Sequence, residues 1–397
     1  MIAPQPFFEP RGTPFSEYHR IRALVDLGHS VDLVTYPFGK DVELRGLRVF
    51  RSLRPPFVRG VRVGPSLAKV ALDIGIAASA LRVALRGGYD AVHSHEEGAA
   101  IGVLLARLLR VPHVYDMHSS LPQQLANFKY SRSRAARALL SWVERLAIRG
   151  SRVVIVICPQ LEAEVRRVDA GTQVVLIENA PGSGDPPREG AGSSVRAALG
   201  IPAAAPLVLY TGTLEAYQGL DLLFEAAARV ISARPETRFV LVGGRSDLLE
   251  AARRQAEGAG LGAAAVFTGE RPSEEIPAFL DAADVLVSPR SAGTNTPLKI
   301  YQYLRSGKPI VATRLLTHTQ VLDDSVAVLV EPTAAGVAEG ILAILADRAK
   351  AQRLGGEARR LAAAKYSYEA YLERTRQAYD KLAPAAPAPA SAPEGVP

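Results

Sequence analysis

Two series of alternating strand and helix patterns constrain the fold of this chain more than any other feature of its sequence. In the first series, short apolar runs bounded by polar residues predict strands, and longer stretches with helical periodicity lie between them. The expected strands cover residues 30–36, 91–94, 112–115 and 153–158, and the expected helices cover residues 16–27, 70–85, 99–109 and 135–148. Alternation of this kind predicts a parallel sheet with helices on both faces.

The alternation stops at residues 179–194 (NAPGSGDPPREGAGSS), which are rich in Pro, Gly and Ser, and it then restarts. In the second series, strands are expected at residues 206–210, 238–243, 265–268, 285–288 and 309–312, and helices at residues 219–233, 248–259, 273–282 and 297–305. Two such series predict an α/β protein of two Rossmann-like, doubly wound domains that face each other across a cleft. Ligands of such sheets bind beyond the carboxyl ends of the strands.

The same patterns predict where the domains begin and end. We expect an N-terminal domain over residues 1–180, a linker over 181–195 and a C-terminal domain over 196–365. A helical pattern at residues 366–382 is expected to pack back on the N-terminal domain, and the Pro/Ala-rich tail 383–397 is expected to be disordered. Residues 1–4 are very short for the first strand of this architecture, so we expect the true start a few residues earlier.

The positive charge of the chain is concentrated in its first half. The net charge is +7; residues 1–185 hold 24 Lys and Arg against 17 Asp and Glu, whereas the remaining residues hold 23 of each. A basic half suits anionic lipid, nucleic acid or an anionic substrate, and an ordinary solvated surface is an equal alternative. Nucleic acid is the weakest of these, because the basic residues are not interleaved with an aromatic platform.

Other bulk properties indicate a globular protein of the cytosol. Hydrophobic residues make up 48% of the chain and charged residues 22%, with a mean hydropathy of +0.08. The sequence has no uncharged apolar run long enough to span a membrane and no signal-peptide pattern. The single cysteine, Cys158, excludes an internal disulfide framework and fits a reducing compartment.

Residues 293–309 (GTNTPLKIYQYLRSGKP) are the segment of the chain with the most features of a ligand-binding site. Thr296 is a good N-cap, Pro297 is favoured at the first helical position, and Gly307 ends the helix. The unsatisfied amides of this helix would then point into a Gly-Thr-Asn loop at the carboxyl edge of the second sheet. Such a helix end is an anion site, although an ordinary capped helix is an equal alternative.

Nearby side chains strengthen the expectation of an anion site. Lys299 and Gln302 are three residues apart and share one face of the helix, so that a cation and an amide can point toward one ligand. Arg290 precedes the loop and can add a planar contact to phosphate.

Residues 288–313 (SPRSAGTNTPLKIYQYLRSGKPIVAT) resemble the donor-binding signature of the retaining GT-B glycosyltransferases of family four. Other parts of the chain are similar to that family in the correct order. They are residues 4–35, 90–95 (DAVHSH), 113–118 (HVYDMH) and 209–223 (LYTGTLEAYQGLDLL). Several motifs in order are far more specific than any single one.

The resemblance implies an activity and a division of labour between the domains. The N-terminal domain would hold a glycan or lipid-linked acceptor, and the C-terminal domain would hold a nucleoside-diphosphate sugar. In this family the leaving diphosphate helps to deprotonate the acceptor hydroxyl, and the protein stabilises the growing negative charge. No metal or other cofactor is expected, because the sequence contains no D-x-D motif and no His/Cys cluster of zinc spacing.

The resemblance also assigns site residues. The expected catalytic residues are His118 and Lys299, and the expected acceptor contacts are Glu96 and Glu97. The expected donor contacts are Gly12, Thr13, Gly212, Thr213, Arg271, Arg290, Thr294, Asn295, Thr296, Pro297, Leu298 and Gln302. Gly12 and Thr13 are expected in a loop before the first helix.

The chain departs from the family pattern at four positions. Two glutamates that the family usually has eight positions apart are replaced by Thr294 and Gln302. An Arg and a Lys that usually follow the first strand of the second domain are replaced by Thr213 and Gln218. The diphosphate is therefore left to helix amides, Lys299 and Arg290.

Two other classes of function remain as alternatives. A non-catalytic sugar-nucleotide or glycan-binding relative would explain the missing glutamates. A nicotinamide-dependent oxidoreductase is disfavoured, because no G-x-G-x-x-G follows a strand in either half. The basic first half also leads us to expect peripheral binding at an anionic membrane surface.

Overall fold

The computed structural model describes residues 1–8, 12–56, 58, 67–122, 134–179 and 190–383. The chain divides into two compact units, which we call the first unit (Met1–Ile177 with Leu372–Pro397) and the second unit (Glu178–Tyr371). The expected linker residues 181–189 and tail residues 384–397 lie outside the described part of the chain.

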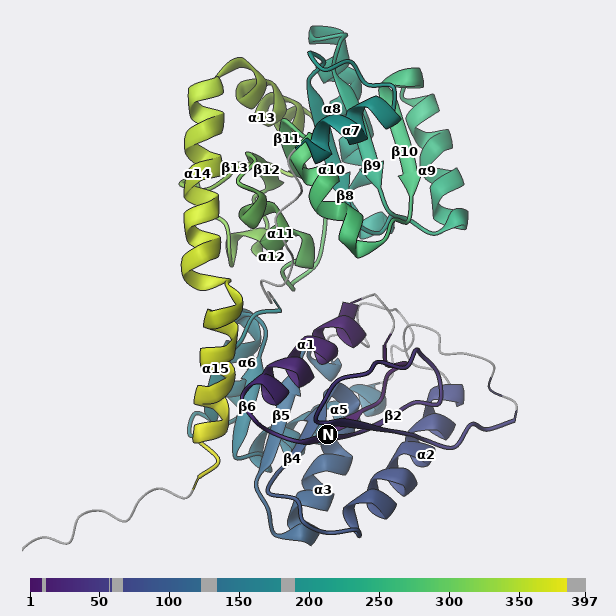
Figure 1. Ribbon diagram of the computed structural model, residues 1–397, viewed down its shortest axis with the longest axis vertical. Coiled ribbons are helices and arrows are strands. Elements are labelled where there is room, and N and C mark those ends of the chain that lie inside the picture. Colours follow the sequence, from purple (N-terminus) through teal and green to yellow (C-terminus); the bar gives the residue numbers. More distant parts are fainter. Residues whose placement is uncertain (9–11, 57, 59–66, 123–133, 180–189, 384–397) are drawn as a thin grey trace, which may run out of the picture. The chain divides into compact units, whose positions relative to one another are not determined.

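The first unit is built on a seven-stranded sheet with the order β3-β2-β1-β4-β5-β6-β7, in which every described strand pair is parallel (Figure 1). Its strands are β1 (Ile2–Ala3), β2 (Val31–Thr35), β3 (Leu47–Arg51), β4 (Val92–His95), β5 (His113–Met117), β6 (Val153–Val156) and β7 (Gln173–Leu176). Its helices are α1 (Gly12–Asp26), α2 (Leu67–Ala84), α3 (Ala99–Leu109), α5 (Arg134–Arg149), α6 (Pro159–Val168) and most of α15 (Tyr368–Asp380).

Alternate residues of the strands bury the two faces of this sheet against different helices. Ala3 and Leu33 pack with Ile21 of α1, whereas their neighbours Ile2 and Val34 pack with α2 and α3. α5 joins α3 over β5 and β6. The sheet is therefore covered on both faces, as parallel sheets require.

The second unit contains a six-stranded parallel sheet with the order β10-β9-β8-β11-β12-β13. Its strands are β8 (Leu207–Thr211), β9 (Arg238–Val242), β10 (Ala265–Gly269), β11 (Val285–Ser288), β12 (Ile310–Thr313) and β13 (Val328–Val330). Its helices are α7 (Ala191–Ala198), α8 (Leu220–Ala233), α9 (Ser246–Gly258), α10 (Ile276–Ala282), α11 (Leu298–Ser306), α12 (Leu316–Thr319), α13 (Ala334–Ala346) and α14 (Arg348–Lys365).

The order of the strands reverses between β8 and β11, and the loops at that point lie very close together. A Cβ on Gly219, after β8, would lie 2.0 Å from the carbonyl oxygen of Pro289, after β11. A Cβ on Gly243, after β9, would lie 2.1 Å from the carbonyl oxygen of Gly212. Glycines are required at both positions, and the crevice at this switch point is where ligands of doubly wound sheets bind.

The two α/β sheets and most of their elements agree with the sequence prediction. The helices α6, α7, α12 and α14 and the strands β3, β7 and β13 were not predicted. The expected linker is wrong at its end, because α7 begins at Ala191. There Gly192 donates its amide to Asp281 and Arg196 donates to the carbonyl of Ala282, so the small residues of this stretch allow α7 to pack closely on α10.

Within the described residues, no helix is both long enough and apolar enough to cross a membrane.

Adjacent glycines in α14 provide a test of how this helix supports α11. A Cβ on Gly355 would lie 2.0 Å from the carbonyl oxygen of Gly307, which ends α11, whereas a Cβ on Gly356 would meet nothing within 4 Å. We expect Gly355→Ala to destabilise the second unit by about 1–3 kcal/mol and Gly356→Ala to stabilise it by about 0.5–1 kcal/mol. Urea unfolding midpoints would measure both, and equal shifts of the same sign would contradict the close approach.

Candidate functional site

The helix α11 of the second unit is held against the ends of two strands. The hydroxyl of Tyr303 accepts a hydrogen bond from the amide of Thr211, at the end of β8, at 2.9 Å. Ile300 and Leu304 of the same helix are fully buried in the core. These contacts direct the N-terminus of α11 to the carboxyl edge of the sheet beside β8 and β11.

The start of α11 differs from the prediction by one residue. Pro297 is the N-cap, with φ −65° and ψ 135°, and no side chain caps the helix. The extended ψ of Pro297 puts Leu298 first, so the prediction of Thr296 as cap and Pro297 as first helical residue was wrong. The Oγ1 of Thr296 is buried and has no hydrogen-bond partner among the described residues. The amide of Ile300 donates to the carbonyl of Pro297 at 3.0 Å, whereas the amides of Leu298 and Lys299 are available to another acceptor.

Lys299, in the first turn of α11, has a buried amino group that pairs with no anion among the residues that the structure describes. Its side chain is 8% exposed, and its Nζ has no hydrogen-bond partner in the described part of the chain. The Nζ lies 3.8 Å from the ring centroid of Tyr210 and would be 3.4 Å from a Cβ on Gly212. Burial, and then the charge of Arg290, hold the pKa of Lys299 well below its ordinary value.

Arg290 organises the loop that precedes α11. Its Nη1 donates to the carbonyl of Asn295 and to the hydroxyl of Thr317, both at 2.7 Å. Its guanidinium carbon lies 5.0 Å from the ring centroid of Tyr217, and Gly293 leaves room for it with φ 121°. Arg290 is thus a structural part of the anion site, with its buried Nε left without a partner among the described residues.

The positions that depart from the family pattern form neutral contacts. Gln218 donates through Nε2 to the hydroxyl of Thr213 at 3.2 Å, and Tyr210 donates to the carbonyl of Thr213 at 2.5 Å. Thr294 is half-buried and its carbonyl accepts from Gln320, at 2.7 Å, and Gln302 is also half-buried. None of these four positions therefore brings a cation to the start of α11, where Lys299 and Arg290 lie.

Three further residues were expected to contact the sugar-nucleotide donor: Arg271, Gly12 and Thr13. Arg271 is exposed, and its Nη1 lies 3.8 Å from Glu275 one helical turn later. Gly12 and Thr13 begin α1 instead of lying in a loop before it, so that part of the prediction was wrong. Pro14 explains the difference, because proline is well tolerated in the first turn of a helix.

A second group of charged side chains lies at the carboxyl edge of the first unit, around Asp116 of β5. The carboxylate of Asp116 is fully buried and accepts from Nε of Arg20, on α1, at 2.9 Å. Burial alone would raise the pKa of Asp116, but the charges of Arg20 and His118 hold it well below its ordinary value. Arg20 also donates to Thr375 of α15, at 3.2 Å, so this ion pair connects α1, β5 and α15.

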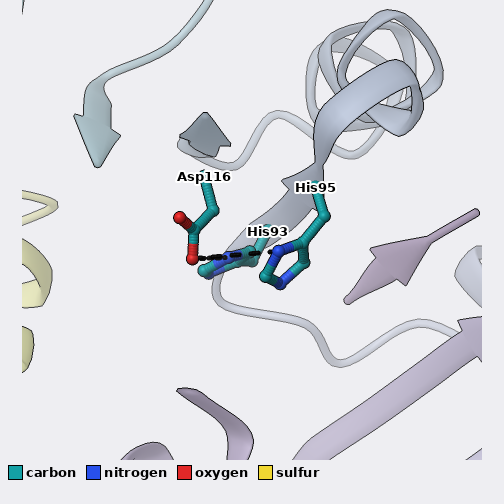
Figure 2. A group of neighbouring side chains, drawn as sticks. All are labelled: His93, His95 and Asp116. Atoms are coloured by element: carbon teal, nitrogen blue, oxygen red, sulfur yellow. Dashed lines mark ion pairs between the residues drawn. The ribbon is translucent and has the colours of Figure 1, made fainter. Parts of the chain in front are cut away.

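Three histidines surround the same carboxylate, and Figure 2 shows two of them, His93 and His95. The distances from Asp116 are 3.5 Å to Nε2 of His93, 3.8 Å to Nδ1 of His95 and 3.1 Å to Nε2 of His118. Burial lowers the pKa of His93 and of His95. Tyr379 of α15 lies 2.7 Å from Nδ1 of His93 through its hydroxyl.

His93, His95 and Asp116 have the composition of a metal site, with ligand atoms within 4.8 Å of one another. However, the guanidinium of Arg20 already occupies Oδ2, the atom that faces both histidines. A cation placed there would lie against Arg20. The chemistry of this donor set therefore fits an ion-pair network better than a metal.

The two acceptor candidates follow β4 directly. Glu96 is buried, has φ 46°, and accepts from Ser119 at 2.9 Å. Burial, with the nearby charge of Glu97, raises the pKa of Glu96 to about 7. Glu97 pairs with Lys69 of α2 at 2.5 Å. A left-handed backbone at a buried acid is strained, which is typical of functional sites.

Several residues of these two groups were not predicted. In the second unit they are Tyr210, Tyr217, Thr317 and His318, and in the first unit they are Arg20, His93, His95 and Asp116. The alternation of His93 with His95 and of Asp116 with His118 places all four on one face of neighbouring strands, and this pattern could have revealed the second group.

Solved structures share this fold. Sucrose-phosphate synthase from Thermosynechococcus elongatus superposes with a TM-score of 0.75, at 24% identity over 94% of both chains. HepE of Anabaena, solved with UDP, gives a TM-score of 0.74, at 17% identity over 96% of this chain and 98% of that one. The two Rossmann-like units therefore define the GT-B class of glycosyltransferase.

The family follows from the sequence. The model of glycosyl transferases group 1 matches residues 193–361, and the model of the glycosyl transferase 4-like domain matches residues 18–180. D-inositol 3-phosphate glycosyltransferase from Corynebacterium urealyticum is 29% identical over 318 residues, which is 74% of this chain and 72% of that protein. The chain belongs to the group 1 glycosyltransferases, and its sequence resemblance to them is confirmed.

The depressed pKa of Lys299 predicts that anion binding takes up a proton. A bound diphosphate favours the ammonium form and raises this pKa, so affinity should increase as the pH falls through the pKa of the lysine in the complex. Calorimetry of UDP binding in buffers of different ionisation enthalpy would measure the uptake. Lys299→Met should remove it; an unchanged uptake in this variant would place the proton elsewhere.

The Arg20–Asp116 pair predicts a large effect of one uncharged replacement. Asp116→Asn removes the carboxylate charge beside the buried guanidinium of Arg20 and should destabilise the first unit by about 3–5 kcal/mol at pH 7. The loss should shrink as the pH falls through the lowered pKa of Asp116, since its stabilisation exists only while the carboxylate is ionised. Urea unfolding would measure the loss. The control is Asp26→Asn, an exposed change on α1, the helix that carries Arg20.

Proposed function

We propose that this protein is a retaining glycosyltransferase that moves a hexose from a nucleoside-diphosphate donor to a glycan or lipid-linked acceptor without a metal ion. The observation that carries the proposal is the buried Nζ of Lys299, which lacks an anionic partner among the described residues beside the uncapped start of α11. A cation and free amides at a switch point suit a diphosphate. HepE, a structural neighbour, has been solved with UDP and with UDP-glucose, which supports a donor of this kind.

The proposed reaction needs no protein nucleophile. The bond between the anomeric carbon and the donor diphosphate breaks, and the acceptor oxygen bonds to the same face of that carbon. The acceptor proton passes to the leaving diphosphate. Lys299, in its ammonium form, and the first-turn amides of α11 stabilise the charge on that diphosphate. His118, whose ring is held beside Asp116, positions the donor sugar.

The contacts proposed for the acceptor come from two carboxylates of the first unit. Glu96 and Glu97 are proposed to accept hydrogen bonds from acceptor hydroxyls. The relative from Corynebacterium is named for an inositol phosphate acceptor, and an anionic or lipid-linked acceptor would suit the basic first half of this chain.

One set of observations favours a second candidate, a non-catalytic relative that binds sugar nucleotides. Thr294 and Gln302 carry no charge, and the positions of two usual cations hold the hydrogen-bonded pair Thr213 and Gln218. In this second candidate the anion site remains, but the charge needed for transfer is missing.

Donor hydrolysis separates the two candidates and tests Lys299. The purified protein is offered a panel of nucleotide sugars, and release of nucleoside diphosphate is measured beside binding. We expect turnover of one donor and a loss of about 10²–10³ in kcat for Lys299→Ala. Arg254→Ala, which removes an exposed cation from α9, is the matched control and should leave both quantities unchanged.

The outcomes have different meanings. Binding without release of nucleoside diphosphate from any donor would support the non-catalytic candidate. Turnover that persists in Lys299→Ala would contradict the role of this lysine. Loss of activity on treatment with a chelator would contradict the metal-independent mechanism.

A further inference from the structure

The helix α2 is apolar on the side that faces away from the sheet as well as on the side that packs on it. Its buried side includes Leu72, Ile76 and Ala80. Its exposed apolar side chains are Val70, Ile74 and Leu81, with exposed fractions of 56%, 67% and 41%, and Leu85, which directly follows the last residue of α2, is 70% exposed. Their spacings of four, seven and four residues place them on one stripe along the helix. A surface helix normally carries polar residues there.

The stripe continues onto the two helices beside α2. α3 contacts α2 and α5, and all three cover the same face of the first sheet (Figure 1). The exposed apolar side chains of α3 are Leu104 and Leu108, and those of α5 are Leu139 and Trp142, each between 57% and 61% exposed. We call these eight side chains the outer apolar face. Clusters of this size on a surface mark an interaction site.

The charges around the outer apolar face are of one sign. Exposed arginines on the three helices are Arg82, Arg107, Arg134, Arg137, Arg145 and Arg149. The acidic residues of the same helices point elsewhere: Asp73 accepts from the hydroxyl of Tyr36 at 2.5 Å, and Glu144 is buried, where it accepts from the amide of Leu121 at 2.8 Å. Among the described side chains of α2, α3 and α5, no acidic group is exposed.

We propose that the outer apolar face binds the surface of an anionic lipid bilayer. Leucines and a tryptophan enter the boundary between headgroups and acyl chains, and the surrounding arginines contact anionic headgroups. A second copy of the chain fits this surface poorly, because two arginine-rich faces repel each other. The proposal concerns the first unit alone and does not depend on the transfer reaction.

Trp142 reports on this face directly, because it is the only tryptophan of the chain. The full protein is mixed with vesicles of phosphatidylcholine alone or with added phosphatidylglycerol, and Trp142 emission and co-sedimentation are measured. We expect a blue shift and quenching by brominated lipid with the anionic vesicles. Binding should weaken with added salt.

Variants on and off the outer apolar face complete the test. Leu81→Glu with Leu85→Glu should weaken vesicle binding by about tenfold or more. Leu316→Glu, at a leucine of the second unit that is 50% exposed, should bind vesicles like the wild type. Thermal unfolding shows that each variant is folded, and donor hydrolysis in solution should be unchanged by the α2 variant.

Three results would overturn the proposal. They are the absence of binding to anionic vesicles, binding that leaves Trp142 emission unchanged, and a shift of that emission with protein concentration in the absence of lipid. The last result, with a dimer in sedimentation, would identify a second copy as the occupant. Failure of donor hydrolysis alone would contradict only the proposed transfer reaction.

Discussion

Parallel pairing of every described strand forces each connection to cross a face of its sheet before the next strand begins. All carboxyl ends of a sheet therefore meet at one edge, and where the strand order reverses, two neighbouring loops turn away from each other. Side chains that would be costly elsewhere collect at these edges. In the first unit the edge contains the carboxylate of Asp116, and in the second unit it contains the amino group of Lys299.

The two buried ionisable groups differ in how the fold compensates them. Asp116 is compensated by Arg20 within the first unit, so its energy is part of the fold. Lys299 faces the ring of Tyr210 and the nearby cation Arg290, and burial favours its neutral form. A neutral lysine avoids the cost of an unpaired charge in the empty site, whereas an arriving diphosphate favours the charged form. Arg290 supports this arrangement by fixing the loop, through Asn295 and Thr317.

Local patterns predicted the strands, most helices and the loop before α11, because apolar periodicity and helix-end residues act within a few residues. Contacts between distant segments were not accessible in the same way. Arg20 and Asp116 are 96 residues apart, and nothing near either residue indicates the other. The start of α11 was misplaced by one residue, because Pro297 has an extended backbone, which its residue type alone does not reveal. The small residues of α7 resembled a linker until their packing on α10 was known.

The two-sided pattern of residues 70–85 shows how periodicity can be correct about a helix and incomplete about its surroundings. The exposed leucines of α2 contribute little to the core of the first unit, so stability alone does not account for them. The helix also has a second connection: near its start, Lys69 pairs with Glu97 directly after β4. α2 thus begins near the edge that holds Glu96 and His118, and its exposed side belongs to the outer apolar face. A bilayer bound along α2 would therefore contact the helix whose Lys69 pairs with Glu97. Glu97 is one of the two proposed acceptor contacts, so this arrangement suits an acceptor presented at a lipid surface.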